Sequence, residues 1–135
     1  MLNKLNNSIK NPFRNGRVFC FSLFLTNVIC FAQPQLKISD AKKSFGFVKK
    51  GDIVKLEYEF TNSGNQPLLI TNSIAECSCT TVEFPIKPIM PNESAKIMVN
   101  FDTKSVYDRQ DRVVEIISNS KPTSKKIRFK GVVLK

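Results

Sequence analysis

The 135-residue sequence has no histidine and no tryptophan, and only five glycines. Without histidine, the chain lacks the most frequent general base, the base of the usual serine and cysteine triads, and the commonest zinc ligand. The glycines form no phosphate-binding loop. Exposed aromatic platforms favour sugar binding, and a chain with only two tyrosines and no tryptophan makes carbohydrate binding a weaker alternative. We therefore expect a protein that is not an enzyme and uses no cofactor.

Residues 1–32 have the composition of a cleavable export signal. Four basic side chains and no acidic one precede an apolar stretch over residues 18–32, which is the order of regions in a signal peptide. Small residues stand at both cleavage positions of Cys30-Phe31-Ala32. The prediction is a signal peptide over residues 1–32 and one domain over residues 33–135, exported to the periplasm or the extracellular side of the cell envelope.

An uncleaved membrane anchor is the alternative for this segment. A spanning helix needs about 20 apolar residues, and the apolar stretch is shorter and is interrupted by Thr26-Asn27. A lipid-acceptor cysteine normally follows a small residue, whereas Cys30 follows Ile29. We therefore expect no stable membrane span after signal cleavage.

The chain is basic, with a formal net charge of +10. Loss of residues 1–32 would remove four of the 21 basic side chains and none of the 11 acidic ones, which leaves +6. Such a surface can be plainly solvated, or it can attract an anionic glycan or lipid. No aromatic side chains alternate with the basic ones as in single-strand binders. We expect no nucleic-acid partner.

Apolar and polar residues alternate with a period of two through most of residues 33–135. The clearest apolar positions are Val54, Leu56, Tyr58, Phe60, Ile97, Val99, Phe101, Ile127 and Phe129. Weaker strands are expected over residues 35–39, 44–48, 68–73, 80–84 and 112–118, with Gly, Pro, Asn and Ser between them. This pattern predicts an all-β fold, a single Ig-like antiparallel β-sandwich of about seven or eight strands.

Some positions carry finer expectations. Phe60, Phe101 and Phe129 are predicted to lie in the core. A bulge at Gly131 would shift the apolar phase from Phe129 to Val132 and Leu134. The alternating Lys126, Arg128 and Lys130 would then protect a terminal edge strand from unwanted pairing, in preference to forming a basic binding stripe. Residues 108–112 are expected to form a charged hairpin connection.

Cys77 and Cys79 are the only cysteines outside the predicted signal. Residues i and i+2 of a regular strand lie at or beyond the upper Cα separation for a disulfide, so a bond would need a local bend. The loop-entropy relation gives such a small ring only about 1.6 kcal/mol of stabilisation. Three roles remain open: a structural pair, as thiols or as a local disulfide; a redox pair; or a Cu(I) site with Met90 or Met98.

Short motifs along the chain resemble the bacterial Domain of Unknown Function 1573, an exported Ig-like module related to Hydin-type sandwiches. They are Phe45-Gly46-Phe47, Lys50-Gly51-Asp52, residues 58–64, residues 67–70, Cys77-Ser78-Cys79-Thr80, residues 88–91, Phe101-Asp102-Thr103, Ser118-Asn119-Ser120 and Lys130-Gly131. The family typically has glycine where this chain has Ser78. The resemblance implies a fold and an exported location, and it implies no activity and no catalytic residues.

The function predicted from these features is an exported, non-enzymatic Ig-like binding or structural module of the cell envelope. Its expected partner is another envelope or surface protein, bound at a sheet edge or through loops. The alternative is a thiol-redox or Cu(I)-handling protein that uses Cys77 and Cys79.

Overall fold

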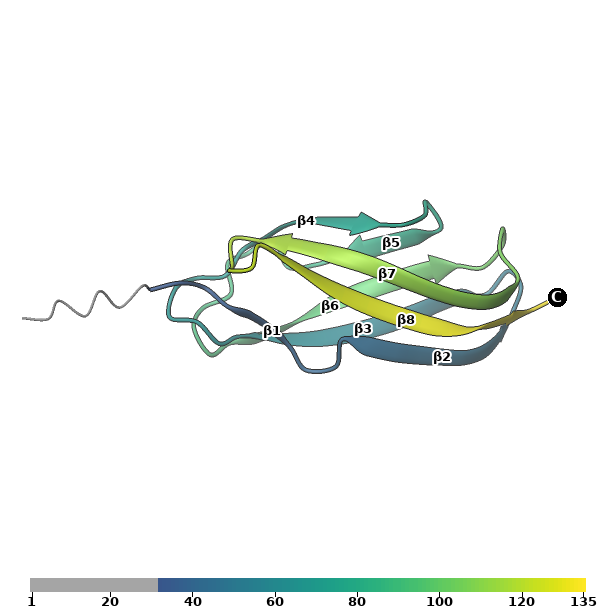
Figure 1. Cartoon of the computed structure of the whole chain (residues 1–135), viewed down its shortest axis with the longest axis horizontal. Helices are drawn as coiled ribbons and strands as arrows, with labels where there is room; N and C mark the ends of the chain where they lie inside the picture. The colour runs from purple at the N-terminus through teal and green to yellow at the C-terminus, as the bar shows by residue number, and fades with distance from the viewer. Residues whose placement is uncertain (1–31) are drawn as a thin grey trace, which may run out of the picture.

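A computed structural model describes residues 32–135, and it shows eight β-strands in two stacked four-stranded sheets (Figure 1). The strands are β1 (Leu36–Ile38), β2 (Lys42–Lys49), β3 (Ile53–Asn62), β4 (Ile70–Ala75), β5 (Thr80–Glu83), β6 (Ser94–Asp102), β7 (Asp108–Ser118) and β8 (Ser124–Leu134). The predicted signal peptide lies outside the described residues except for Ala32. Within residues 32–135, no helix has the length and apolar character needed to cross a membrane.

The strand order is β1-β3-β6-β5 in sheet A and β2-β8-β7-β4 in sheet B. Every pairing among the described strands is antiparallel except the parallel pairing of β2 with β8. The chain therefore crosses between the two layers several times, as in an Ig-like sandwich. The predicted all-β sandwich is confirmed.

The core lies between the sheets, and the inward positions are those that the alternation predicted. Tyr58, Phe60, Ile97, Val99, Phe101, Ile127 and Phe129 are fully buried. Phe101 of sheet A and Phe129 of sheet B meet with ring centroids 5.3 Å apart, and Phe45 of β2 packs against both. The Tyr58 hydroxyl donates to the Arg128 carbonyl at 3.1 Å. Burial, with a smaller contribution from Asp40, raises the pKa of this phenol, which keeps it protonated as a donor.

The expectations for β8 are wrong in two respects. First, β8 is an interior strand between β2 and β7, so the basic side chains of β8 protect no edge. Second, the core phase continues through Gly131 to Val133, which is buried, while Leu134 is exposed. The register shift lies in β2 between Ser44 and Gly46, and the pairing of β8 with β7 is continuous.

Gly131 is at an inward position of β8, where the Phe45 ring fills the space that a side chain would need. A Cβ atom added at Gly131 would overlap the ring of Phe45. The ring projects from the irregular part of β2 into the place that a side chain on β8 would take. The glycine thus accommodates an aromatic side chain and does not mark a bulge in its own strand.

The expected hairpin connection over residues 108–112 is also wrong. These residues begin β7, which is longer than the alternation indicated. Arg112 is half-buried on the inward phase of the strand and donates to the Gln110 side chain at 2.9 Å. Arg109 and Asp111 face solvent on the outer side of sheet B. Asp111 there pairs with Arg128 of β8 through two contacts of 2.6 Å, and this pairing lowers the pKa of the Asp111 carboxyl.

Asn62 fixes the end of sheet A where the chain enters the sandwich. Its side chain is fully buried. The amide donates to the carbonyls of Gln66 at 2.7 Å and Ile89 at 2.9 Å, and it accepts from the backbone N–H groups of Gly64 at 3.0 Å and Gln35 at 3.3 Å. One side chain therefore joins three backbone segments.

Candidate functional site

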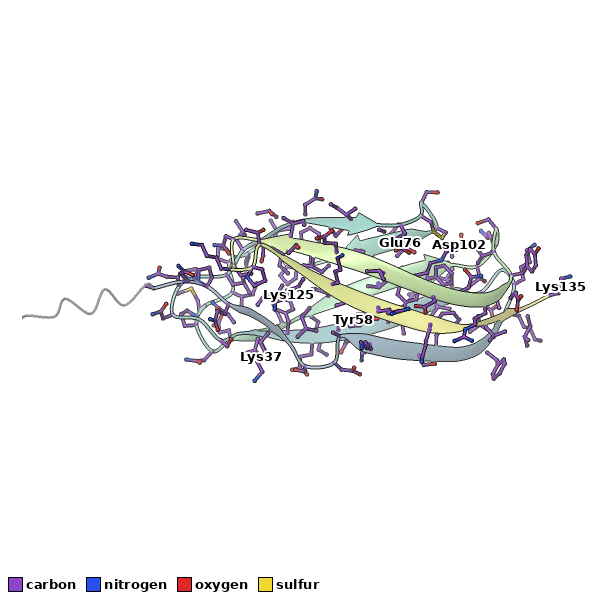
Figure 2. All side chains as sticks on the ribbon, viewed as in Figure 1. Lys37, Tyr58, Glu76, Asp102, Lys125 and Lys135 are labelled. Atoms are coloured by element: carbon purple, nitrogen blue, oxygen red, sulfur yellow. A yellow bond between two sulfur atoms is a disulfide. The ribbon has the colours of Figure 1, made fainter. Side chains whose placement is uncertain are left out.

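Cys77 and Cys79 lie in the connection between β4 and β5, where the chain passes from sheet B to sheet A. The structure joins them by a disulfide with Cα atoms 5.2 Å apart. Asp102 donates its backbone N–H to the Cys79 carbonyl at 2.8 Å, and Thr80 donates to the Cys77 carbonyl at 3.2 Å. Figure 2 labels Glu76, which precedes the pair in the chain, and Asp102, which donates to it. The pair forms a compact turn at the end of β6.

The turn supplies the local bend that a disulfide between these positions requires. Ser78 and Cys79 are in a turn and not in a strand, which brings the Cα atoms inside the ordinary disulfide range. Among the described residues, the non-glycine positions with positive φ are Asn92 and Asp108. Ser78 therefore does not need the conformational freedom of the glycine that is typical of this position.

The chemistry open to this pair follows from its partly buried position. Both sulfurs lie near the Thr80 hydroxyl, at 3.9 and 4.0 Å, and Cys79 packs against the core. A disulfide offers exchange with an outside thiol, whereas Cu(I) needs the reduced thiolates.

The structure does not bring the predicted methionines to the cysteines. Met98 of β6 pairs with Glu83 of β5. It lies three residues from Phe101, which pairs with Thr80, and three residues span about 10 Å along a strand. Met90 follows Ile89, which bridges to Leu68 in a different connection. In the described part of the chain, no group of three or more Cys, Asp or Glu side chains is arranged to hold a metal ion.

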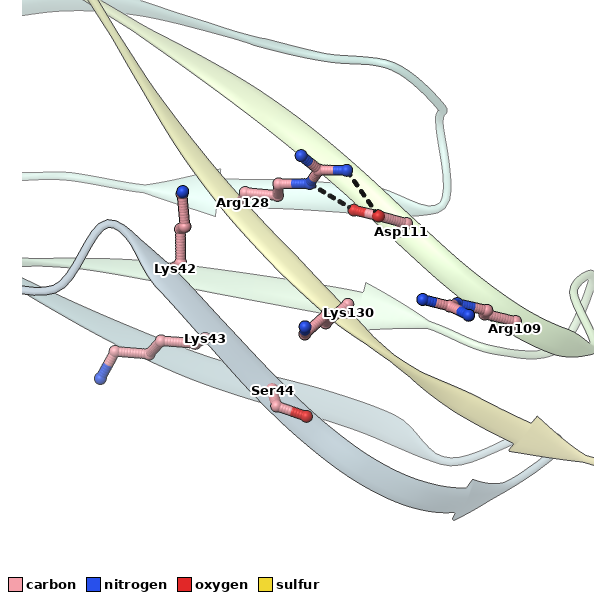
Figure 3. A pocket seen from close by; sticks show the side chains of 7 residues that line it. All are labelled: Lys42, Lys43, Ser44, Arg109, Asp111, Arg128 and Lys130. Carbon is pink, nitrogen blue, oxygen red and sulfur yellow. Dashed lines mark hydrogen bonds and ion pairs between the residues drawn. The ribbon is translucent and has the colours of Figure 1, made fainter.

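A second feature is a groove of about 490 Å³ on the outer face of sheet B (Figure 3). Its lining comes from three strands: Lys42, Lys43 and Ser44 of β2, Arg109 and Asp111 of β7, and Arg128 and Lys130 of β8. Five of the seven lining residues are cationic and one is a carboxylate. Sequence reasoning missed this groove because the parallel pairing of β2 with β8 joins segments about 85 residues apart, and no local pattern indicates such a pairing.

The third feature is the set of four edge strands. β1 has three residues, β5 has four and ends at Glu83, and β2 carries three lysines and a bulge. These are the devices by which proteins prevent edge-to-edge pairing. β4 has six residues, no charge and no proline, and residues 72–75 are in continuous register with β7. The outer backbone edge of β4 is the least protected of the four.

Comparison with known families and structures agrees with this architecture. A family model described as "Protein of unknown function (DUF1573)" matches residues 36–133. No curated protein matches the chain.

Solved structures with a similar fold come from several kinds of protein. A protein of unknown function from Porphyromonas gingivalis W83 is 18% identical with a TM-score of 0.65, over 75% of this chain and 48% of that one. The ASH / PapD-like domain of human CEP192 is 11% identical with a TM-score of 0.61, over 77% and 88%. The E. coli chaperone DraB is 10% identical with a TM-score of 0.52, over 74% and 54%. These likenesses show a shared β-sandwich fold, and the chain spans about half the length of the Porphyromonas protein.

Proposed function

The chain belongs to the DUF1573 family of proteins of unknown function, and from this membership we propose that it is an exported, non-enzymatic binding module of the cell envelope. The observation that carries the proposal is the edge of β4, which is the least protected of the four. Within this edge, Ser73 donates its N–H to the Asn72 side chain at 2.8 Å. An extended segment of another envelope protein would add to sheet B as a further strand beside β4.

Backbone geometry supports this mode of binding. In an edge strand, alternate residues direct their N–H and C=O groups away from the sheet, and a partner strand can pair with them. Asn72 and Ile74 are exposed, and Ile74 lines a shallow hollow with Val113, Glu115 and Lys126. A partner side chain would fill this hollow next to Ile74, which adds side-chain selectivity to the main-chain hydrogen bonds.

Export remains a prediction from residues 1–32. It is tested by mass spectrometry of the native protein recovered from the envelope fraction. A mature N-terminus at Gln33 supports export with cleavage, and an intact N-terminus in cytosolic material contradicts it.

Replacing Ile74 with lysine is expected to abolish recovery of the partner while leaving the fold intact. Ile74 is 54% exposed, so a lysine is tolerated there, yet its charge beside the edge opposes an added strand. The matched control is Ile53→Lys, because Ile53 is 56% exposed and lies in sheet A. The measurement is cross-linking of the tagged protein in envelope extract, followed by hydrogen exchange of the complex.

Slower exchange of the amides of residues 72–75 in the complex supports strand addition at β4. A partner that Ile74→Lys and Ile53→Lys recover equally well contradicts it, and so does the absence of any specific partner.

The disulfide favours a second candidate function, thiol exchange at Cys77 and Cys79. For a purely structural pair, the double substitution of both cysteines with serine should lower the free energy of unfolding by at most about 1.6 kcal/mol, measured by urea denaturation. For a redox pair, the wild-type disulfide should also be readily reduced by a glutathione buffer, which thiol titration measures. Resistance of the wild-type disulfide to this buffer removes the second candidate.

A further inference from the structure

The outer face of sheet B changes from cationic to apolar along its strands. The register of β2 with β8 places Lys42 beside Arg128, Ser44 beside Lys130, Phe47 beside Val132 and Lys49 beside Leu134. On the other side of β8, Asp111 is opposite Lys130 and Arg109 is opposite Val132. The rows of this face therefore begin with lysine and arginine, and their other end gathers Phe47, Val132 and Leu134 with Lys49 beside them.

The apolar end of this face is exposed, and we name its four residues, Phe47, Tyr107, Val132 and Leu134, the apolar tip. Phe47 is 75% exposed, Tyr107 57% and Leu134 46%. Val132 joins the others, because it lines one hollow with Phe47 and a second with Tyr107 and Leu134. Exposed apolar side chains gathered at one place on a soluble domain mark an interaction site.

Most cations of the groove are not in ion pairs, and two of them, Arg109 and Lys130, border the apolar tip directly. Arg128 is held by Asp111, but no salt bridge involves Lys42, Lys130 or Arg109 among the described residues. Figure 3 shows that Lys42 and Lys43 extend to opposite sides of β2. The Lys43 ammonium group lies 5.5 Å from the centre of the Tyr58 ring. The free positive charge of the groove therefore comes mainly from Lys42, Lys130 and Arg109.

We infer that this face of sheet B docks on an anionic phospholipid surface. The apolar tip enters the boundary between headgroups and acyl chains, while Lys130, Arg109 and Lys42 lie against the lipid phosphates. A soluble anion would use the cations and leave Phe47 and Leu134 exposed to water. A neutral apolar ligand would leave the cations without partners. An anionic membrane surface matches both parts at once.

This docking is independent of the proposed binding edge. In sheet B, β2 and β4 are at opposite edges, with β8 and β7 between them. The lipid face is centred on β2 and β8, so β4 stays accessible to a protein partner. Loss of lipid binding and loss of partner binding can therefore be observed separately.

The test is co-sedimentation of the whole purified protein with vesicles. One set contains phosphatidylglycerol and phosphatidylcholine, the other phosphatidylcholine alone. We expect binding to the anionic vesicles only, and we expect it to weaken when ionic strength rises from about 0.1 M to about 1 M, because the Debye length then falls from about 10 Å to about 3 Å. Lys130→Gln should weaken binding roughly fivefold, and Phe47→Ser at least about tenfold.

Two control variants make the same chemical changes elsewhere. Lys55→Gln removes one exposed lysine from sheet A. Ile86→Ser removes a side chain that is 87% exposed and lies in the connection between β5 and β6. Both should change vesicle binding less than about twofold, because neither belongs to the face. All variants share the N-terminus of the wild type, so any contribution from that segment cancels in the comparison.

Several results would overturn the inference. Equal binding to both kinds of vesicle would show that the phosphates do not matter. If Lys55→Gln weakened vesicle binding as much as Lys130→Gln, the attraction would depend on the net charge of the protein and not on this face. Binding of inorganic phosphate without vesicle binding would assign the groove to a soluble anion. Binding to a polyglutamate peptide, without vesicle binding, would assign the face to an acidic protein.

Discussion

Replacing Phe101 with alanine is expected to lower the free energy of unfolding by about 3 to 5 kcal/mol. Phe101 is fully buried, and its ring contacts Phe129 of the opposite sheet and Phe45 of β2. The substitution removes the apolar contact that joins the two layers at this level and leaves a cavity that rigid sheets cannot close. Such a loss is a large share of the total stability of a small domain. Urea denaturation followed by circular dichroism measures it.

The chain supplies its own control for this experiment. Phe47 is two residues from Phe45 on the same strand, but it is 75% exposed. Phe47→Ala should therefore change the free energy of unfolding by about 0.5 kcal/mol or less, as surface substitutions usually do. Similar losses for Phe101→Ala and Phe47→Ala would mean that the sheets do not pack through this aromatic cluster.

The alternation of apolar and polar residues was sufficient to predict the strands and their inward faces. This holds for β3 and β6, where Tyr58, Phe60 and Phe101 are buried as expected. The reason is physical: the side-chain period of a strand is two, so a half-buried strand must place its apolar residues on one face. The pattern contains no information about which strands become neighbours, because pairing depends on contacts distant in sequence.

The failure at β8 shows this limit. The sequence pattern predicts a bulge at Gly131, because the apolar phase passes from Phe129 to Val132 and Leu134. Val133 is the buried residue, and Leu134 is exposed. The local pattern therefore failed to predict burial at the apolar tip, where apolar side chains lie outside the core. Such conflicts between pattern and fold are expected at functional surfaces, which connects this error with the proposed lipid face.

Three of the motifs that carry the family resemblance have structural roles in close contacts and turns. Gly64 lies against the incoming chain, where an added Cβ would be 2.6 Å from the Gln35 nitrogen. The Thr103 hydroxyl donates to the Asp52 carbonyl at 2.7 Å and accepts from the Gly51 N–H at 3.0 Å, which closes the turn between β2 and β3. Gly51 has a φ of 96° in that turn. These motifs specify the sandwich, which is why they predicted the fold and not an activity.

Replacing Asn62 with alanine is expected to lower the free energy of unfolding by about 3 kcal/mol or more, although Asn62 is polar and belongs to a segment that looks like an ordinary turn. Its buried amide makes four hydrogen bonds to backbone groups. The Ile89 carbonyl keeps the Leu68 N–H as a donor, but the other three groups lose this partner in the alanine variant. Each buried group left unpaired costs about 1 to 3 kcal/mol.

Asn65 provides the comparison for this substitution. It also accepts a backbone hydrogen bond, from Gln33 at 2.8 Å, but it does so at the surface. Water can replace the Asn65 side chain, so Asn65→Ala should cost about 1 kcal/mol or less. Urea denaturation of both variants measures the difference. Hydrogen exchange should also show faster opening at the end of β3 in Asn62→Ala, because the segments that meet at Asn62 lose their common partner. Equal costs for the two substitutions would mean that burial of the Asn62 amide does not hold these segments together.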